Sequence, residues 1–157
     1  QRFVDRKYRA YGLELEGTYR SGIFSLTAGG TWTKSKIVSD ALTPALVGNV
    51  PRRQAEFVFQ ATPQVDIGPV TVGANFIGTT SSYAQDSDQL KLPGYTTVNT
   101  FLQYRPIERV QLSLNANNLF NAKGFTEAEE GVIPANGIVR ARSINGRTIS
   151  AAVRLTF

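Results

Sequence analysis

Apolar and polar residues alternate strictly along the last eleven residues of the chain, Arg147–Phe157. One face carries only polar or small side chains, and the other carries Ile149, Ala151, Val153, Leu155 and Phe157. A period of two over about ten residues is the pattern of a β-strand that crosses a bilayer, apolar toward lipid and polar toward a lumen. Strands of soluble sheets average about five or six residues, so the segment favours a membrane-spanning strand.

The same two-faced pattern recurs upstream, and it predicts seven strands in all and no helix. The six further segments are Tyr11–Tyr19, Phe24–Lys34, Ala55–Thr62, Val70–Thr79, Thr97–Tyr104 and Val110–Phe120. This register assigns no charge to the outward, apolar face, whereas the opposite face receives Glu14, Glu16, Glu56 and Arg154. Because a charge at mid-bilayer costs about 2–4 kcal/mol, the segregation indicates that the outward face meets lipid.

The inward face is too polar for the core of a soluble protein. Its amides would each need a buried partner, which a water-filled lumen supplies instead; they are Asn75, Asn99, Gln103, Asn115 and Asn117. Three apolar residues also point inward, and we expect them to pack against something inside the barrel: Val58, Ile77 and Phe101. Aromatic residues near the predicted strand ends suit the girdles of a membrane barrel: Tyr19, Trp32, Tyr95 and Tyr104.

The connections between the predicted strands alternate in length. Short ones, Arg20–Gly22, Pro63–Pro69 and Pro106–Arg109, are separated by long ones, Ile37–Arg53, Tyr83–Gly94 and Asn121–Gly146. Outer-membrane barrels have short periplasmic turns and long extracellular loops, so the last strand is expected to end on the periplasmic side. An open sheet with an odd number of strands leaves unpaired edges in hydrocarbon. We therefore interpret residues 1–157 as the C-terminal part of one larger transmembrane, antiparallel meander β-barrel, an all-β fold.

Composition removes several classes of function. No apolar run approaches the roughly 18 residues of a transmembrane helix, and the absence of cysteine excludes disulfides and thiolate sites. Histidine, the usual metal ligand and general base, is also absent. We predict no enzyme, no metal site and no cofactor. The 17 basic residues give a net charge of +5 but form no stripe, which argues against nucleic acid. The first residues lack the apolar region of a signal peptide, so an export signal is expected upstream.

Several short motifs resemble the end of a TonB-dependent outer-membrane receptor, over nearly the whole chain. They are Gly12–Glu16, Val50–Pro51, Pro93–Tyr95, Asn117–Asn121 and the terminal Phe157. The most specific is Asn118-Leu119-Phe120-Asn121, which resembles the Asn-Leu-Phe-Asp segment of the family, with Asn121 in place of the usual aspartate.

This resemblance implies a barrel of 22 strands filled by a plug domain, with about the last seven strands supplied here. It implies a location in the Gram-negative outer membrane and active uptake of a scarce small-molecule ligand. Siderophore-bound iron is the commonest ligand of the family, while carbohydrate and cobalamin stay open. Coupling to the TonB complex would run through an N-terminal part that this sequence does not contain.

The terminal strand also resembles the β-signal that the barrel-assembly machinery reads. Ser150, Val153, Leu155 and Phe157 fit that pattern, while Ala152 stands where glycine is usual. An aromatic ring at the chain end would sit at the inner membrane–water interface. The alternative is an aromatic residue that merely ends a strand.

The longest loop carries the candidate ligand-binding residues Arg140, Arg142 and Arg147, with Glu127 nearby. Arginines can clamp carboxylates, phosphates or an anionic siderophore; the alternatives are a solvated loop or contact with phosphates of lipopolysaccharide. Asp86 and Asp88 are spaced like the start of a calcium loop but lack the remaining ligands. Two other classes stay open at this point: a passive porin or small structural barrel, and a soluble lectin-like β-sandwich.

Overall fold

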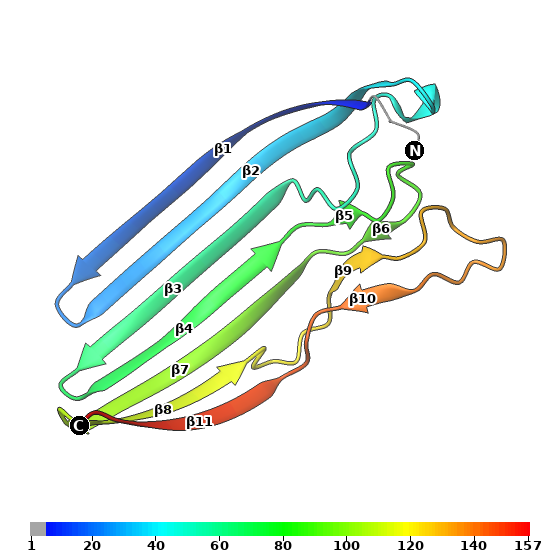
Figure 1. The fold of residues 1–157 in the computed structure, drawn as a ribbon. Coiled ribbons are helices and arrows are strands. Elements are labelled where there is room, and N and C mark those ends of the chain that lie inside the picture. The colour runs from blue at the N-terminus through cyan, green and yellow to red at the C-terminus, as the bar shows by residue number, and fades with distance from the viewer. Residues whose placement is uncertain (1–5) are drawn as a thin grey trace.

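The computed structural model of the protein describes residues 6–157. Seven strands form one antiparallel sheet in which each strand pairs with its neighbours along the chain (Figure 1). The strands are β1 (Arg6–Ser21), β2 (Phe24–Asp40), β3 (Phe57–Ile67), β4 (Val70–Thr79), β7 (Tyr95–Ile107), β8 (Val110–Asn117) and β11 (Thr148–Leu155). Two small sheets lie in the loops, β5 (Ser82–Tyr83) with β6 (Lys91–Leu92) and β9 (Phe125–Ala128) with β10 (Ala141–Ser143). The predicted all-β meander is confirmed, and a short 3-10 turn, η1 (Pro44–Leu46), is the helical element of the described chain.

All three short connections lie at one end of the sheet, the turn end, and all three long loops lie at the other, the loop end (Figure 1). We name these loops A (residues 41–56), B (80–94) and C (118–147). The chain leaves β11 at the turn end, where the C-terminus lies.

The strand register places the predicted outward residues on one continuous face. Leu13 pairs with Trp32, which pairs with Phe57, and at the other side of the sheet Leu102 pairs with Leu114 and Leu114 with Ala151. Directly opposed residues of antiparallel strands share a face. The alternation read from each strand separately therefore adds up to one apolar surface across all seven strands.

Two strands run further toward the turn end than proline led us to expect. The prediction of a turn over Pro63–Pro69 is wrong, because β3 continues to Ile67 and the turn is only Gly68–Pro69. Gly68 has φ 55°, a left-handed angle that glycine adopts without steric cost. Likewise β7 continues through Pro106 to Ile107, with an irregularity in the register after Tyr104. Such bulges accept a proline because they do not need its missing N–H.

Other boundaries shift at the loop end. β1 begins at Arg6 and β2 extends to Asp40, so the first hairpin rises well beyond the predicted strands Tyr11–Tyr19 and Phe24–Lys34. β3 begins at Phe57 instead of Ala55, β7 begins at Tyr95, and β8 ends at Asn117 instead of Phe120. The last strand is trimmed to Thr148–Leu155.

The sheet has almost no buried apolar core. Among residues 6–157 the buried hydrophobic residues are Ile37, Ala84, Leu92 and Ala128, all at the loop end, whereas the outward face leaves large side chains such as Leu15, Tyr19 and Val153 more than half exposed. Contiguous exposed apolar surface of this extent marks a partner or a membrane. The seven strands form a single layer without a second large sheet against it in residues 6–157, so the β-sandwich alternative does not describe this part of the chain. No helix of that part is both long and apolar enough to cross a membrane.

Five residues predicted to face inward or to lie in an aromatic girdle are placed individually by the structure. Phe101 lies on the polar face as expected, and its ring covers its cross-strand partner Gly73, where a Cβ would lie 2.5 Å from the ring. Tyr95 is not a girdle residue: it pairs with Thr79 on the polar face and packs against Gly124. Trp32, Tyr19 and Tyr104 do lie on the apolar face.

The prediction that Glu56 faces the lumen is wrong for its carboxylate. Glu56 precedes β3 in a bend, and its Oε1 accepts a hydrogen bond of 3.0 Å from the indole of Trp32 on the apolar face. Glu14 and Glu16 remain on the polar face, opposite Thr31 and Gly29. The alternation of inward and outward side chains does not hold for Glu56, because this residue lies outside the paired residues of β3.

Candidate functional site at the loop end

Loops B and C share a small apolar core at the loop end. Ala84, Leu92 and Ala128 are buried against one another, with Leu90 and Val139 packed around them. This contact brings β6 of loop B beside β9 of loop C, as Figure 1 shows. The long loops are thus folded against one another, and side chains from distant parts of the sequence meet there.

Arg6 and Asp40 join the first hairpin to loop B. Arg6 Nε donates to Asp40 Oδ2 at 2.6 Å, and Arg6 Nη1 lies 2.5 Å from Asp86 Oδ2. The other oxygen of Asp40 accepts from the backbone N–H groups of Leu42 and Thr43 at 2.9 and 2.8 Å. Since the Asp40 side chain is fully buried, this network fixes where β2 ends and loop A begins.

Asp86 also ties loop A to loop B. Its Oδ1 accepts from the backbone N–H of Arg52 at 2.8 Å, and its carbonyl oxygen accepts from Asn49 at 2.9 Å. Its carboxylate is thus occupied by Arg6 and by the backbone. Within residues 6–157 no group of three or more histidine, cysteine, aspartate or glutamate residues is arranged to hold a metal ion.

Glu127 of β9 is held between two arginines. Its carboxylate lies 2.7 Å from Arg53 Nη1 of loop A and 3.0 Å from Arg142 Nη1 of β10. The glutamate side chain is 18% exposed, whereas that of Arg142 is 70% exposed. The structure therefore joins the two predicted ligand residues Glu127 and Arg142, and it adds Arg53, which the sequence did not single out.

Arg140 lies on the neighbouring glutamates of the same loop. Its Nε is 3.1 Å from Glu130 and 3.4 Å from Glu129, and its backbone N–H also donates to Glu130 at 2.8 Å. Burial alone would raise the pKa of Glu130, but the hydrogen bonds from Arg140 outweigh it and hold that pKa below the ordinary value. The same hydrogen bond raises the pKa of Arg140, whose side chain is 77% exposed.

Arg147 does not join this group. It directly precedes β11, where its backbone N–H donates to Asn121 Oδ1 at 3.0 Å and its guanidinium donates to the carbonyl of Leu119. It therefore helps to close the base of loop C. The acceptor in this contact is an amide oxygen that an aspartate would equally provide, which explains physically how Asn121 can replace the usual aspartate.

Asn118 ties both ends of loop C together. The residue is 4% exposed and has φ 46°, a left-handed angle at which asparagine is enriched. Its amide donates to the carbonyls of Ala122 and Asn145 at 2.9 Å each, and its Oδ1 accepts from the N–H of Ala122. Leu119 donates to the carbonyl of Val98, whereas the ring of Phe120 is exposed. The motif Asn118–Asn121 thus forms the hydrogen-bonded turn that ends β8 and starts loop C.

The residues of the predicted β-signal lie on β11, at the edge of the sheet. Val153 pairs with Leu112 and Leu155 with Val110 on the apolar face, while Ser150 pairs with Asn115 on the polar face. Phe157 follows the strand at the turn end and is fully exposed. The assembly role of these residues stays a prediction.

A hollow lies on the polar face. A cavity of about 410 Å³ is lined by Glu14, Glu16 and the inward apolar residues Val58 and Ile77, among others. It combines two carboxylates with an apolar floor, away from the arginines of loop C. Val58 and Ile77, the apolar exceptions on the inward face, thus line one cavity, and their common parity on paired strands places both on the polar face.

The sequence could have revealed the Arg6–Asp40 pair, but not the Arg53–Glu127 pair. If the pairing of the first hairpin is continued from its turn at Gly22, Arg6 lies one residue away from the position opposite Asp40. The irregularity in the register after Lys7 shifts the pairing by that one residue. The second pair depends on how loops A and C fold together, for which no periodic signal exists.

Comparison with known proteins places this fold in a family. A family model described as TonB dependent receptor-like, beta-barrel matches residues 2–119. The chain therefore belongs to the TonB-dependent receptor-like β-barrel family. A search of curated proteins finds no match.

Solved structures resemble nearly the whole chain. The siderophore receptor PiuA from Acinetobacter baumannii is 20% identical with a TM-score of 0.82, over 96% of this chain and 22% of that one. The ferric yersiniabactin uptake receptor FyuA from Yersinia pestis is 20% identical with a TM-score of 0.83, over 97% and 24%. The copper transporter OprC is 19% identical with a TM-score of 0.71, over 96% and 24%.

These likenesses establish the fold. The chain spans only about a fifth to a quarter of the length of the structures that it matches. The matched structures are described as a siderophore receptor, an uptake receptor and a copper transporter.

Proposed function

We propose that this chain is the C-terminal segment of a larger outer-membrane receptor and supplies part of its barrel wall and extracellular loops. We call this larger protein the whole receptor. It takes up a scarce solute with energy from the TonB complex. The observation that carries the proposal is the apolar face that continues through the register of all seven strands. In such a barrel the loop end is extracellular and the turn end periplasmic.

Siderophore-bound iron is the ligand that we propose. Several matched structures are named as siderophore or ferric-chelate receptors, and exposed arginines in loop C suit an anionic chelate. Arg140 and Arg142 are paired with glutamates yet remain mostly exposed. We infer that an anionic ligand binds the exposed guanidinium groups of Arg140 and Arg142, while Glu127 holds Arg142 in place for it.

Uptake of iron by cells tests the proposal. Cells that depend on the whole receptor should accumulate radiolabelled ferric siderophore only when TonB is intact. Uptake that persists without TonB would contradict the active mechanism and would support a passive pore instead. Copper, cobalamin and oligosaccharides tested in the same cells would identify a different ligand.

The arginines are tested in the same assay. Arg142→Ala should leave the amount of inserted receptor unchanged and should weaken uptake at limiting ligand, whereas Arg20→Ala, at the turn end of the polar face, should leave uptake unchanged. Equal uptake by Arg142→Ala and wild type would remove Arg142 from the ligand site.

A further inference from the structure

Four basic residues gather on the outward face at the loop end of the first hairpin. Lys7 and Arg9 lie on β1, and Lys34 and Lys36 lie on β2. Arg9 pairs directly with Lys36, and Lys34 pairs with the outward residue Tyr11, so all four share the apolar parity. We call them the rim basic cluster; all four residues are exposed. The expectation that the outward face carries no charge is therefore wrong at the loop end of this hairpin, where Lys34 lies within the predicted strand.

The cluster continues the apolar face in a definite order. Moving from mid-strand toward the loop end, the outward face presents Leu13, then the edge-to-face pair of Tyr11 and Trp32 with ring centroids 6.0 Å apart. The ammonium of Lys34 lies 5.7 Å from the centroid of the Trp32 ring. Apolar, aromatic and cationic residues in this order match the hydrocarbon, interface and headgroup layers of a membrane.

Within the described part of the seven-stranded sheet, cations lie on the outward face only at the loop end. The other arginines of the seven described strands, Arg6, Arg20, Arg105 and Arg154, belong to the polar face, as their cross-strand partners and hydrogen bonds indicate. At the turn end the outward positions are Tyr19, Phe24, Val65 and Tyr104. Among these outward positions, only those at the loop end thus carry the cations that a headgroup layer attracts.

Most of this charge has no partner in the described chain. Lys34 lies 3.7 Å from Glu56, but no carboxylate among residues 6–157 forms a salt bridge with Lys7, Arg9 or Lys36. Two like charges directly opposite each other on neighbouring strands destabilise a sheet. An external anion beside Arg9 and Lys36 would relieve this repulsion.

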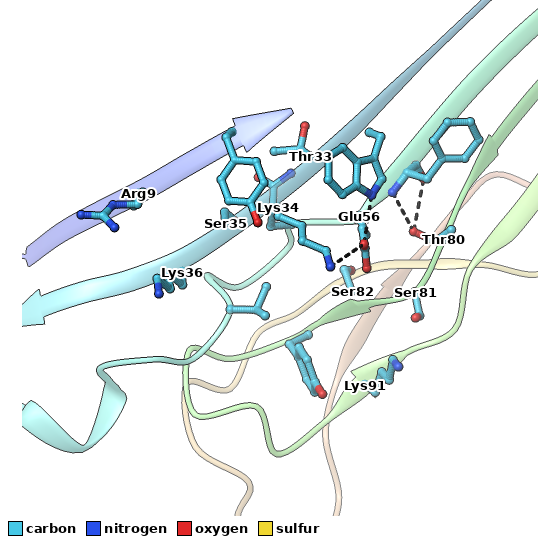
Figure 2. A pocket seen from close by; sticks show the side chains of 16 residues that line it. Arg9, Thr33, Lys34, Ser35, Lys36, Glu56, Thr80, Ser81, Ser82 and Lys91 are labelled. Carbon is cyan, nitrogen blue, oxygen red and sulfur yellow. Dashed lines mark hydrogen bonds and ion pairs between the residues drawn. The ribbon is translucent and has the colours of Figure 1, made fainter. Parts of the chain in front are cut away.

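The space for such an anion is present. A cavity of about 460 Å³ is lined by Arg9, Lys34 and Lys36 on one side and by Lys91 of β6 on another. Figure 2 shows Arg9 and Lys36 at this cavity while Lys34 turns toward Glu56. Ser81 and Ser82 add hydroxyl groups to its wall.

We propose that the rim basic cluster binds the phosphate groups of the anionic glycolipid in the outer leaflet, the lipid A part of lipopolysaccharide. The proposal rests on the proposed function, because it requires the loop end to face the outside of the cell. Phosphate is favoured over a carboxylate partner because the cations extend the lipid-facing surface at headgroup level, where lipid-borne phosphates are concentrated. Guanidinium and ammonium groups form charge-assisted hydrogen bonds to phosphate oxygens.

Binding of lipid A to the purified whole receptor in mild detergent tests this site. The variant Lys7→Gln, Arg9→Gln, Lys36→Gln is compared with the control Arg20→Gln, Arg105→Gln, Arg154→Gln, which removes equal charge from the polar face. Each cation near a membrane surface contributes about a fivefold affinity. We expect the rim variant to bind bisphosphorylated lipid A roughly a hundredfold more weakly, and the control to bind it as wild type does.

Two further arms identify the source of the phosphate. Dephosphorylated lipid A should bind the wild type as weakly as it binds the rim variant, and millimolar inorganic phosphate should not displace the lipid. Displacement by inorganic phosphate would overturn a lipid site in favour of a free-anion site. Equal binding of phosphorylated lipid A by the rim variant and wild type would overturn the cluster as its site.

Failure of this proposal differs from failure of the proposed function. Both variants should insert as heat-modifiable barrels and take up ligand in cells. A wild-type receptor that inserts and transports but whose lipid binding ignores the rim substitutions would overturn only the lipid site. A wild-type protein that does not insert would overturn both.

Discussion

The guanidinium of Arg53 lies 2.7 Å from the carboxylate of Glu127, which joins loop A to loop C. The two residues are far apart in sequence, and Glu127 shares a second contact with Arg142 of β10. One carboxylate therefore links three segments of the loop end.

Replacing Glu127 by Gln should loosen loop C without affecting insertion. Each surface ion pair contributes about 0.2–1 kcal/mol, so loss of two should raise the population of the open loop by roughly two- to thirtyfold. The rate of tryptic cleavage at loop C on intact cells measures this change. Glu129→Gln is the matched control, because Glu129 contacts only the mostly exposed Arg140; equal cleavage of both variants would contradict the tether.

Asn118→Asp should destabilise the folded receptor. The substitution keeps the acceptor for Ala122 N–H but removes the two donors to the carbonyls of Ala122 and Asn145. Leaving these buried groups unsatisfied should cost about 1–3 kcal/mol. Urea unfolding of the purified receptor measures the loss. Asn117→Asp, whose side chain makes one bond of 3.3 Å to Thr148, should lose less; an equal loss would contradict the special role of Asn118.

Acid should release the tip of loop C. The pKa of Glu130 in the folded loop lies below its ordinary 4.5, so its contact with Arg140 stabilises the loop above pH 4.5 and is lost as pH falls through the folded value. A spin label at Asn136→Cys, the sole cysteine in this stretch, should become more mobile only below pH 4.5. The same label combined with Glu130→Gln should be mobile throughout; low mobility in that variant at pH 7 would refute the contact.

The terminal strand should govern assembly. Deleting Phe157 or substituting Leu155→Lys should reduce the amount of heat-modifiable receptor in the membrane and leave its synthesis intact. Leu155 faces outward opposite Val110, whereas Arg154, the neighbour for a control substitution Arg154→Lys, faces inward opposite Gln111. Wild-type insertion of both outward variants would contradict a β-signal in this strand.

The fold was predictable because its main determinant is local. In β8, Val110, Leu112 and Leu114 alternate with Gln111 and Ser113, and the side-chain period of a strand assigns each residue to a face without knowledge of its partners. Strand ends were less predictable, because Pro63 and Pro106 occupy positions where the ladder does not need an N–H.

The contacts of the loop end were only partly predictable. Charges in loop C identified Glu127 and Arg142, but Arg53 lies in loop A and reaches Glu127 only through the packing of the loops. The separation of Arg147 from Arg140 and Arg142 follows from its hydrogen bond to Asn121. Neither relation has a periodic signature along the chain.

The alternation of lipid and lumen along one strand tests the central claim most directly. The cysteine-free sequence allows single cysteines to be placed in turn along β8, Val110–Asn117, in the whole receptor and spin-labelled in a lipid bilayer. We predict high accessibility to oxygen dissolved in the lipid at Val110, Leu112, Leu114 and Ala116, and low accessibility at the four residues between and after them. Equal accessibility of Leu114 and Asn115 would contradict a membrane-facing sheet.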